Sequence, residues 1–237
     1  NQARRFLNYV TKLRGLTTSW ISDGVNSWLK IDLGRTVLVD SITLGRDRSG
    51  GFDDRDPGQF TIEVALTDDV YANGNDSNDS VEYSQVFDSS SVSFSGIIVG
   101  PQTLEASFSK SAARFVKLTV TNAGAAIDEV EVFGSLLVNI DIKPGSSKNT
   151  VNPKSKGVIP VVILGGASLD VDISTVTFGP SGASPAHNGH TEGDDLVLHF
   201  RTQETGIQTG DTEACLTGQT IGDIDIEGCD TIKTVGK

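Results

Sequence analysis

The sequence predicts an all-β protein. Two segments far apart in the chain, residues 28–34 and 126–134, alternate apolar and polar side chains and end at a glycine, as strands do. The inward positions of the first are Leu29, Ile31 and Leu33. Valine, isoleucine and threonine dominate the chain while good helix formers are sparse, which favours strands. Two such segments on either side of a β-rich stretch predict the first and last core strands of one antiparallel sandwich.

The first half of the chain reads as a series of strands separated by turn residues. Residues 4–16 are ambiguous between a short helix and irregular chain. The segment 67–80 is dense in aspartate, asparagine, serine and glycine, which predicts a long exposed loop. Further strands are expected at residues 37–44, 59–66, 81–87, 103–108, 114–121 and 129–133.

A second unit is expected after a very short linker at Ser135-Leu136. Its run 158–164 is apolar on both faces, so it should be central and buried, with Pro160 where no ladder hydrogen bond is needed. The strand pattern and the length predict a smaller, immunoglobulin-like sandwich. We therefore predict domains at 1–136 and 137–237, the second with strands at residues 138–142, 158–164, 175–178, 195–201, 214–217 and 220–226.

The charge of the chain limits its partners. A net charge of −12 makes binding to nucleic acid or to an anionic membrane unfavourable, and this acidity suits an extracellular setting that contains calcium. No apolar run reaches the ~18 residues of a membrane span. The sequence has no methionine, so we expect a processed product or a fragment of a longer protein.

Two cysteines, Cys215 and Cys229, lie close in sequence on either side of an expected turn at residues 217–220. A disulfide between them would close a loop worth roughly 3 kcal/mol by the chain-entropy estimate. The alternative is a pair of reduced, buried thiols.

The first half of the chain also resembles a known family. The motifs that carry the resemblance are Thr18-Ser19-Trp20 and residues 28–34, 39–47, 113–118 and 127–134. In order and spacing they are similar to a discoidin domain, also called an F5/8 type C domain, whose bacterial members include family 32 carbohydrate-binding modules. The resemblance implies an eight-stranded jelly roll with ligand loops at one end and often a structural calcium ion.

The implied calcium site is only partly matched. Such domains take ligands from a Leu-Asp-Gly segment ahead of the Thr-x-Trp motif and from the first glutamate of the last strand. Glu129 fits the second role, whereas Arg14 stands where the aspartate is expected. A cation there opposes Ca²⁺, which takes roughly 6–8 oxygen ligands. The alternative is that Arg14 pairs with Glu129.

Residues 138–237 resemble a domain that recurs at the C-terminal side of large secreted or surface proteins of marine and environmental bacteria. The resemblance brings no activity that can be transferred. Its motifs are residues 139–146, 152–161, 196–200 and 213–218.

A ligand site in the first domain is expected in the loop 46–56. The loop combines guanidinium donors, carboxylates and one aromatic ring, the groups that hold sugars. The alternative is that its arginines form salt bridges within the loop. Trp20 and Trp28 are expected to pack beneath the loops. The predicted ligand-binding residues are Arg46, Arg48, Phe52, Asp54 and Arg55.

Calcium is the one cofactor predicted, and its candidate ligands are scattered. The loop 67–80 lacks the spacing of an EF-hand, so a solvated loop is the alternative there. His187 and His190 offer nitrogen ligands for a transition metal, but their spacing is not that of a helical or strand pair. The predicted calcium ligands are Glu129, Asp68, Asp69, Asp76, Asp79, Glu192 and Asp194.

Catalysis finds little support in the sequence. There is no nucleophile elbow, HExxH motif or phosphate-binding glycine loop. We therefore predict a non-catalytic, extracellular carbohydrate-binding module pair of a larger secreted or surface protein, with a glycan or a surface protein as partner. The alternative is a structural or adhesive surface protein, or a self-assembling subunit of an extracellular assembly.

Overall fold

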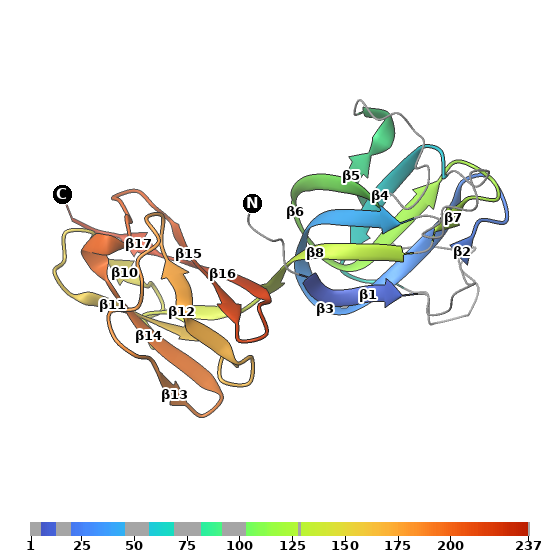
Figure 1. Cartoon of the computed structure of the whole chain (residues 1–237). Coiled ribbons are helices and arrows are strands. Elements are labelled where there is room, and N and C mark those ends of the chain that lie inside the picture. The colour runs from blue at the N-terminus through green and yellow to red at the C-terminus, as the bar shows by residue number, and fades with distance from the viewer. Residues whose placement is uncertain are drawn as a thin grey trace. The chain divides into compact units, whose positions relative to one another are not determined.

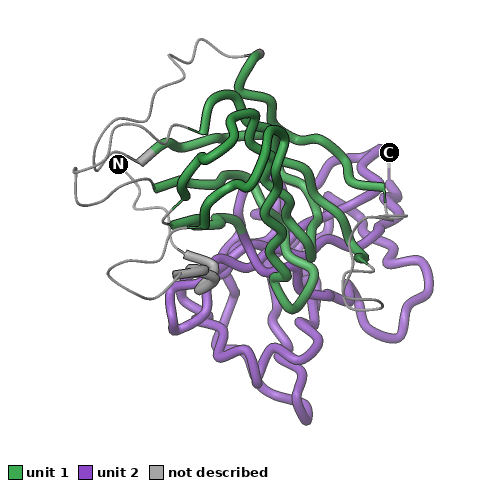
Figure 2. The backbone as a smooth tube through the Cα atoms, turned by 90° about the vertical axis from the view of Figure 1, so that its right-hand side faces the viewer, with its two compact units in different colours: residues 1–134 green, residues 135–237 purple. Residues whose placement is uncertain are grey.

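The computed structural model describes residues 6–12, 20–45, 57–68, 82–91, 103–127 and 129–236. Its elements are strands apart from two short 3-10 turns, η2 (Ser89–Ser91) and η3 (Thr202–Glu204), in the part described (Figure 1), so the all-β prediction is confirmed. The chain divides into two compact units, Asn1–Gly134 and Ser135–Lys237 (Figure 2).

Unit 1 is built around two long antiparallel strands, β3 (Ser27–Gly45) and β6 (Thr103–Val120), in a sheet that runs β8-β3-β6-β4-β5. The expected separate strands at 28–34 and 37–44 are therefore one strand. Its pairing with β6 is irregular between Asp32 and Val37, where Gly34 takes a positive φ of 75°. Such an irregularity lets a long strand bend around a core. The other strands are β2 (Trp20–Ile21), β4 (Phe60–Ala65), β5 (Ser84–Asp88), β7 (Ala126–Ile127) and β8 (Glu129–Leu137).

The N-terminal segment is neither a helix nor irregular chain. Residues Phe6–Lys12 form strand β1, which pairs antiparallel with β8, with Lys12 opposite Glu129. Both expected conformations were wrong because pairing with a strand more than a hundred residues away along the chain, rather than local preference, decides the structure here.

Two of the inward positions predicted for the first strand, Ile31 and Leu33, are confirmed as buried. Ile31 is 6% exposed and Leu33 is fully buried, and both belong to the core of unit 1. Gly134, which follows the last core strand, allows β8 to approach β3 closely. A Cβ atom at that position would lie 1.8 Å from the carbonyl oxygen of Leu38, so no larger residue fits without displacing the backbone.

Unit 2 contains two main sheets with a shared core. One runs β13-β14-β11-β9, and the other runs β12-β15-β16 and continues to the end of β8. The Phe178 and Phe200 rings, one from each sheet, lie 5.0 Å apart between centroids. The strands are β9 (Ile140–Ile142), β10 (Thr150–Val151), β11 (Val158–Ile163), β12 (Val171–Phe178), β13 (His190–Glu192), β14 (Asp195–Arg201), β15 (Glu213–Thr220), β16 (Asp225–Thr231) and β17 (Lys233–Thr234). An immunoglobulin-like topology stays a prediction.

Strand β11 is central, as its two apolar faces predicted. The carbonyl of Pro160 accepts a 2.8 Å hydrogen bond from the amide of Lys143, just past the end of β9. The nitrogen of a strand residue points to the same side as its carbonyl, so the Pro160 nitrogen faces the end of the β9 ladder. The missing donor therefore leaves no break between paired strands.

The turn expected at residues 217–220 is wrong. Strand β15 continues to Thr220, and the chain reverses at Ile221–Ile224, where Asp223 takes a φ of 63°. Gly218 was mistaken for a turn residue. Gly218 lies within β15. A glycine suits this position because a Cβ atom there would lie 3.0 Å from the Val176 side chain on β12.

The linker expected at Ser135-Leu136 is also wrong, because both residues belong to strand β8 and are buried. Leu136 and Leu137 pair in parallel with Ile226 and Glu227 of β16. The first six residues of β8 thus belong to unit 1 and the last three to unit 2.

Candidate functional site

Most residues predicted to bind ligand or calcium in unit 1 fall in segments outside the described residues, so their predictions stand as made. They are Arg46, Arg48, Phe52, Asp54, Arg55, Asp69, Asp76 and Asp79. Asp68, Glu129, Glu192 and Asp194 are described.

The outer face of the β3-β6-β4 sheet carries a group of aromatic and charged side chains. The outward alternation of β3 places Trp28 and Lys30 on this face, and the strand register sets Lys30 opposite Lys117 of β6, which in turn lies opposite Glu63 of β4. Tyr83 joins them from the segment that leads into β5. We call this group the Trp28 face; its members are Trp28, Lys30, Glu63, Asp68, Tyr83 and Lys117.

Lys30 holds the group together. Its Nζ lies 3.2 Å from Asp68 Oδ2 and 4.9 Å from the centroid of the Trp28 ring. The side chains of Lys30 and Asp68 are 7% and 0% exposed. A buried charge is tolerated only when it is paired, so the ion pair explains how both groups are accommodated.

Tyr83 lies between two ammonium groups. Its ring centroid is 5.1 Å from the Nζ atoms of both Lys30 and Lys117, and its hydroxyl donates to the Asp68 carboxylate. Lys117 also pairs with Glu63 at 3.2 Å. Cation–π contacts at this distance are attractive, so these contacts hold the polar groups of the face in fixed positions.

Trp28 is the most exposed ring of this face, with 38% of its surface accessible. The prediction that it packs beneath the loops is therefore wrong, because the strand register places it on the outer face of β3. The same alternation leads to Asp32, whose carboxylate accepts hydrogen bonds of 3.0 and 3.2 Å from Arg114. This contact lowers the pKa of Asp32, so the pair stays charged at neutral pH.

The structure does not support a calcium role for Asp68. Its oxygens are occupied by the Lys30 ammonium and the Tyr83 hydroxyl, and a cation already stands where Ca²⁺ would have to be. Sequence inspection missed this because Lys30 lies 38 residues earlier in the chain.

Glu129 is a buried carboxylate, 4% exposed, at the start of β8. Its Cβ lies 3.3 Å from where a Cβ on Gly45 would be, so the end of β3 approaches it closely. Its predicted calcium role stays a prediction.

Glu192 and Asp194 do not converge on one site. Glu192 is the last residue of β13, whereas Asp194 belongs to the two-residue turn Gly193-Asp194 before β14, in which Gly193 has a φ of 64°. Glu192 lies 3.2 Å from the Nε2 of His190, whereas Asp194 accepts a hydrogen bond from Ser168. The calcium site predicted at this turn is therefore not supported.

All three histidines of the chain meet in unit 2. The ring centroid of His199, on β14, is 4.8 Å from that of His187 and 6.2 Å from that of His190. Partial burial lowers the pKa of His199, and the neighbouring histidines lower it further. The sequence had grouped only His187 and His190, because His199 reaches them across a hairpin.

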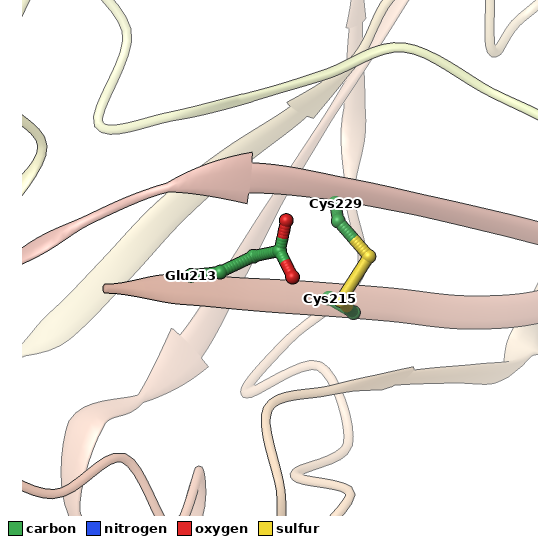
Figure 3. A group of neighbouring side chains, drawn as sticks. All are labelled: Glu213, Cys215 and Cys229. Carbon is green, nitrogen blue, oxygen red and sulfur yellow. A yellow bond between two sulfur atoms is a disulfide. The ribbon is translucent and has the colours of Figure 1, made fainter. Parts of the chain in front are cut away.

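The disulfide prediction is confirmed, although the turn between the cysteines was misplaced. Cys215 and Cys229 face each other directly across β15 and β16, and their sulfurs are bonded. The carboxylate of Glu213 lies beside the disulfide (Figure 3). These three residues would be a candidate metal group if the cysteines were thiolates, but sulfurs bonded to each other do not supply thiolate ligands.

No family model matches the chain, and neither does any curated protein. Among solved structures it is similar to the module CpGH89CBM32-5 from Clostridium perfringens, determined with GalNAc-β-1,3-galactose, at 17% identity and a TM-score of 0.37, over 49% of this chain and 76% of that one. It is also similar to the C-terminal domain of a chitobiase from Bacteroides fragilis (20%, TM-score 0.38, 52% and 76%). A third structure is the family 32 module of AlyQ with 4,5-unsaturated mannuronic acid (22%, TM-score 0.36, 50% and 79%).

The family 32 modules among these structures are of the kind that the sequence resembles. In the described part of the chain, no helix is long and apolar enough to span a membrane.

Proposed function

We propose that the chain is a non-catalytic carbohydrate-binding protein and that unit 1 binds a glycan on the Trp28 face. The observation that carries the proposal is the exposed Trp28 ring held beside the Lys30 ammonium. Sugars are bound by stacking on an aromatic surface together with a few fixed polar groups. Trp28 supplies the surface, and Lys117 and Glu63, each about one fifth exposed, supply the polar groups.

The charges of the face favour a neutral sugar. Lys30 and Lys117 of the face, and Arg114 beside it, each have a carboxylate partner, so these cations are balanced where they stand. Ammonium groups donate hydrogen bonds and carboxylates accept them, and a sugar hydroxyl does both. An ammonium beside a carboxylate therefore matches a hydroxyl-rich neutral ring better than an acidic one. The positions from Trp28 to Asp32 extend about 13 Å along β3, which accommodates more than one ring.

We further propose an extracellular setting, as part of a larger secreted or surface protein. The Cys215–Cys229 disulfide supports this, because disulfides persist mainly in oxidising compartments. The sequence resemblances of both halves point the same way. The loop 46–56, with its predicted ligand residues, stays a second candidate position for the sugar.

Replacing Trp28 with alanine is expected to weaken glycan binding by more than about tenfold, because an aromatic anchor carries a large share of the energy of a small interface. Binding partners would first be found on an array of neutral and acidic oligosaccharides. Affinities of the hits would then be measured by calorimetry. Val25→Ala, a truncation at a nearby residue that is 70% exposed, is the matched control and should bind normally.

Two further variants locate the sugar. If Arg46→Ala abolishes binding while Trp28→Ala leaves it intact, the sugar binds in the loop 46–56 and the Trp28 face is the wrong site. If the protein binds no glycan but forms concentration-dependent polymers in sedimentation, the structural or adhesive alternative replaces this proposal.

Calcium is proposed only at Glu129 among the described residues. If calcium binds the native state alone, millimolar Ca²⁺ should raise the Tm in proportion to ln(1 + [Ca²⁺]/Kd) and EDTA should reverse the rise. Magnesium should substitute poorly, because it requires a smaller octahedral site. Glu129→Gln should remove the calcium effect. A Tm that is the same in EDTA and in calcium would remove the ion from the proposal.

A further inference from the structure

We propose that His187, His190 and His199 of unit 2 form a binding site for a late first-row divalent transition metal such as Zn²⁺, Ni²⁺ or Cu²⁺. Neutral imidazole nitrogens are preferred ligands of these ions. The inference is independent of the sugar site, because all three residues lie in unit 2 and the Trp28 face lies in unit 1.

The three rings lie close together, but their side chains must turn before their nitrogens can meet at one ion. A metal–nitrogen bond of about 2.0–2.1 Å, with tetrahedral angles, places the centroids of two bound rings about 5 Å apart. The observed centroid distances from His199 are 4.8 Å to His187 and 6.2 Å to His190. The plane of the His199 ring makes an angle of 36° with the ring of His187 and 21° with the ring of His190. Turning the exposed His187 and His190 side chains to aim at one point requires only rotamer changes.

Both outer histidines have an oxygen acceptor within reach of one ring nitrogen. Nδ1 of His187 lies 2.9 Å from the carbonyl oxygen of Asn188, so it carries the proton and Nε2 has the lone pair. Nε2 of His190 lies 3.2 Å from the Glu192 carboxylate and donates to it. A metal-binding histidine usually donates its other N–H to a carbonyl or a carboxylate in this way.

The third histidine has an unused polar atom. Nδ1 of His199 is buried and has no hydrogen-bond partner in the described part of the chain. A buried polar atom without a partner is costly and rare. Its neighbours on the β14 face are the two other imidazoles, and β11 contributes Pro160 opposite it, which offers no N–H. An ion shared by the three rings would fix the orientation of His199.

Calorimetry with ZnCl₂ and NiCl₂ on the full chain is expected to show one site per molecule, and saturating metal should raise the Tm of unit 2. Cu²⁺ should give a d–d absorption band typical of nitrogen ligation. His187→Gln and His190→Gln, both at exposed positions, should each weaken binding by more than about tenfold, as should His199→Asn.

Two carboxylate variants distinguish metal binding at the histidines from non-specific attraction of the cation to acidic side chains. Glu192→Gln should weaken binding by about tenfold, because it holds the orientation of His190. Asp194→Asn is the matched control. It lies two residues away, faces Ser168, and should bind metal as the unchanged chain does. Binding that survives all three histidine substitutions, or that Asp194→Asn lowers as much as they do, would overturn the proposal.

Discussion

Replacing Asp68 with alanine is expected to lower the free energy of unfolding of unit 1 by about 3–5 kcal/mol, because it leaves the buried Lys30 ammonium without its carboxylate. All tryptophan and tyrosine residues of the chain precede residue 135. Urea denaturation followed by their fluorescence therefore reports unit 1 without a contribution from unit 2. Asp23→Asn, at an exposed turn in the same unit, is the control and should stay close to the unchanged chain.

A double substitution tests whether pairing is the cause. In Lys30→Met/Asp68→Leu both charges are removed together, and a buried ion pair replaced by apolar groups of similar size often loses little stability. The double variant should therefore be more stable than Asp68→Ala alone. Equal losses of stability in both variants would mean that packing, rather than the unpaired charge, sets the cost.

Asp68→Ala should also weaken glycan binding, because Lys30 supports the Trp28 ring.

Reducing the Cys215–Cys229 disulfide is expected to destabilise unit 2 by about 3 kcal/mol, since the bond joins residues with a sequence separation of 14. The oxidised, denatured protein should show no titratable thiol. Because unit 2 has no tryptophan or tyrosine, its unfolding would be followed by hydrogen exchange of the β15 and β16 amides.

The Cys215→Ser/Cys229→Ser variant should reproduce the effect of reduction and should no longer respond to reductant. Unit 1 provides the internal control, because its fluorescence transition should not move. Protection of the β15 and β16 amides that is unchanged by reduction would show that the direct pairing of the two strands, rather than the cross-link, holds them together.

Strands whose period-2 pattern is strong could be predicted from the sequence, and elements decided by distant partners could not. The alternation of Leu29, Ile31 and Leu33 was sufficient because one face of β3 is buried. Strand β1 was missed because its pairing with β8 is long-range. Gly218 was misjudged because a glycine required by close packing against Val176 looks the same in sequence as a glycine required by a turn.

The candidate sites follow the same division. The disulfide was predictable because the chain has two cysteines, which can form one intramolecular pair. The Trp28 face and the three-histidine cluster were not, because strand register assembles each of them from residues that are separate in sequence. Asp68 shows the converse error. An acidic residue in a polar stretch reads as a free oxygen ligand until the structure reveals the lysine it neutralises.

The last residues of β8 have a consequence for how the chain can be divided. They pair with β16, which is otherwise the outer strand of the β12-β15-β16 sheet, and the amide of Val138 donates a further 2.9 Å hydrogen bond to Glu227. A fragment beginning at residue 137, as the sequence-based boundary prescribes, would lose the pairing of Leu136 with Ile226 and so expose part of the β16 edge. Such edges recruit strands from other molecules, so that fragment should aggregate, whereas one beginning at Ser135 keeps its edge covered.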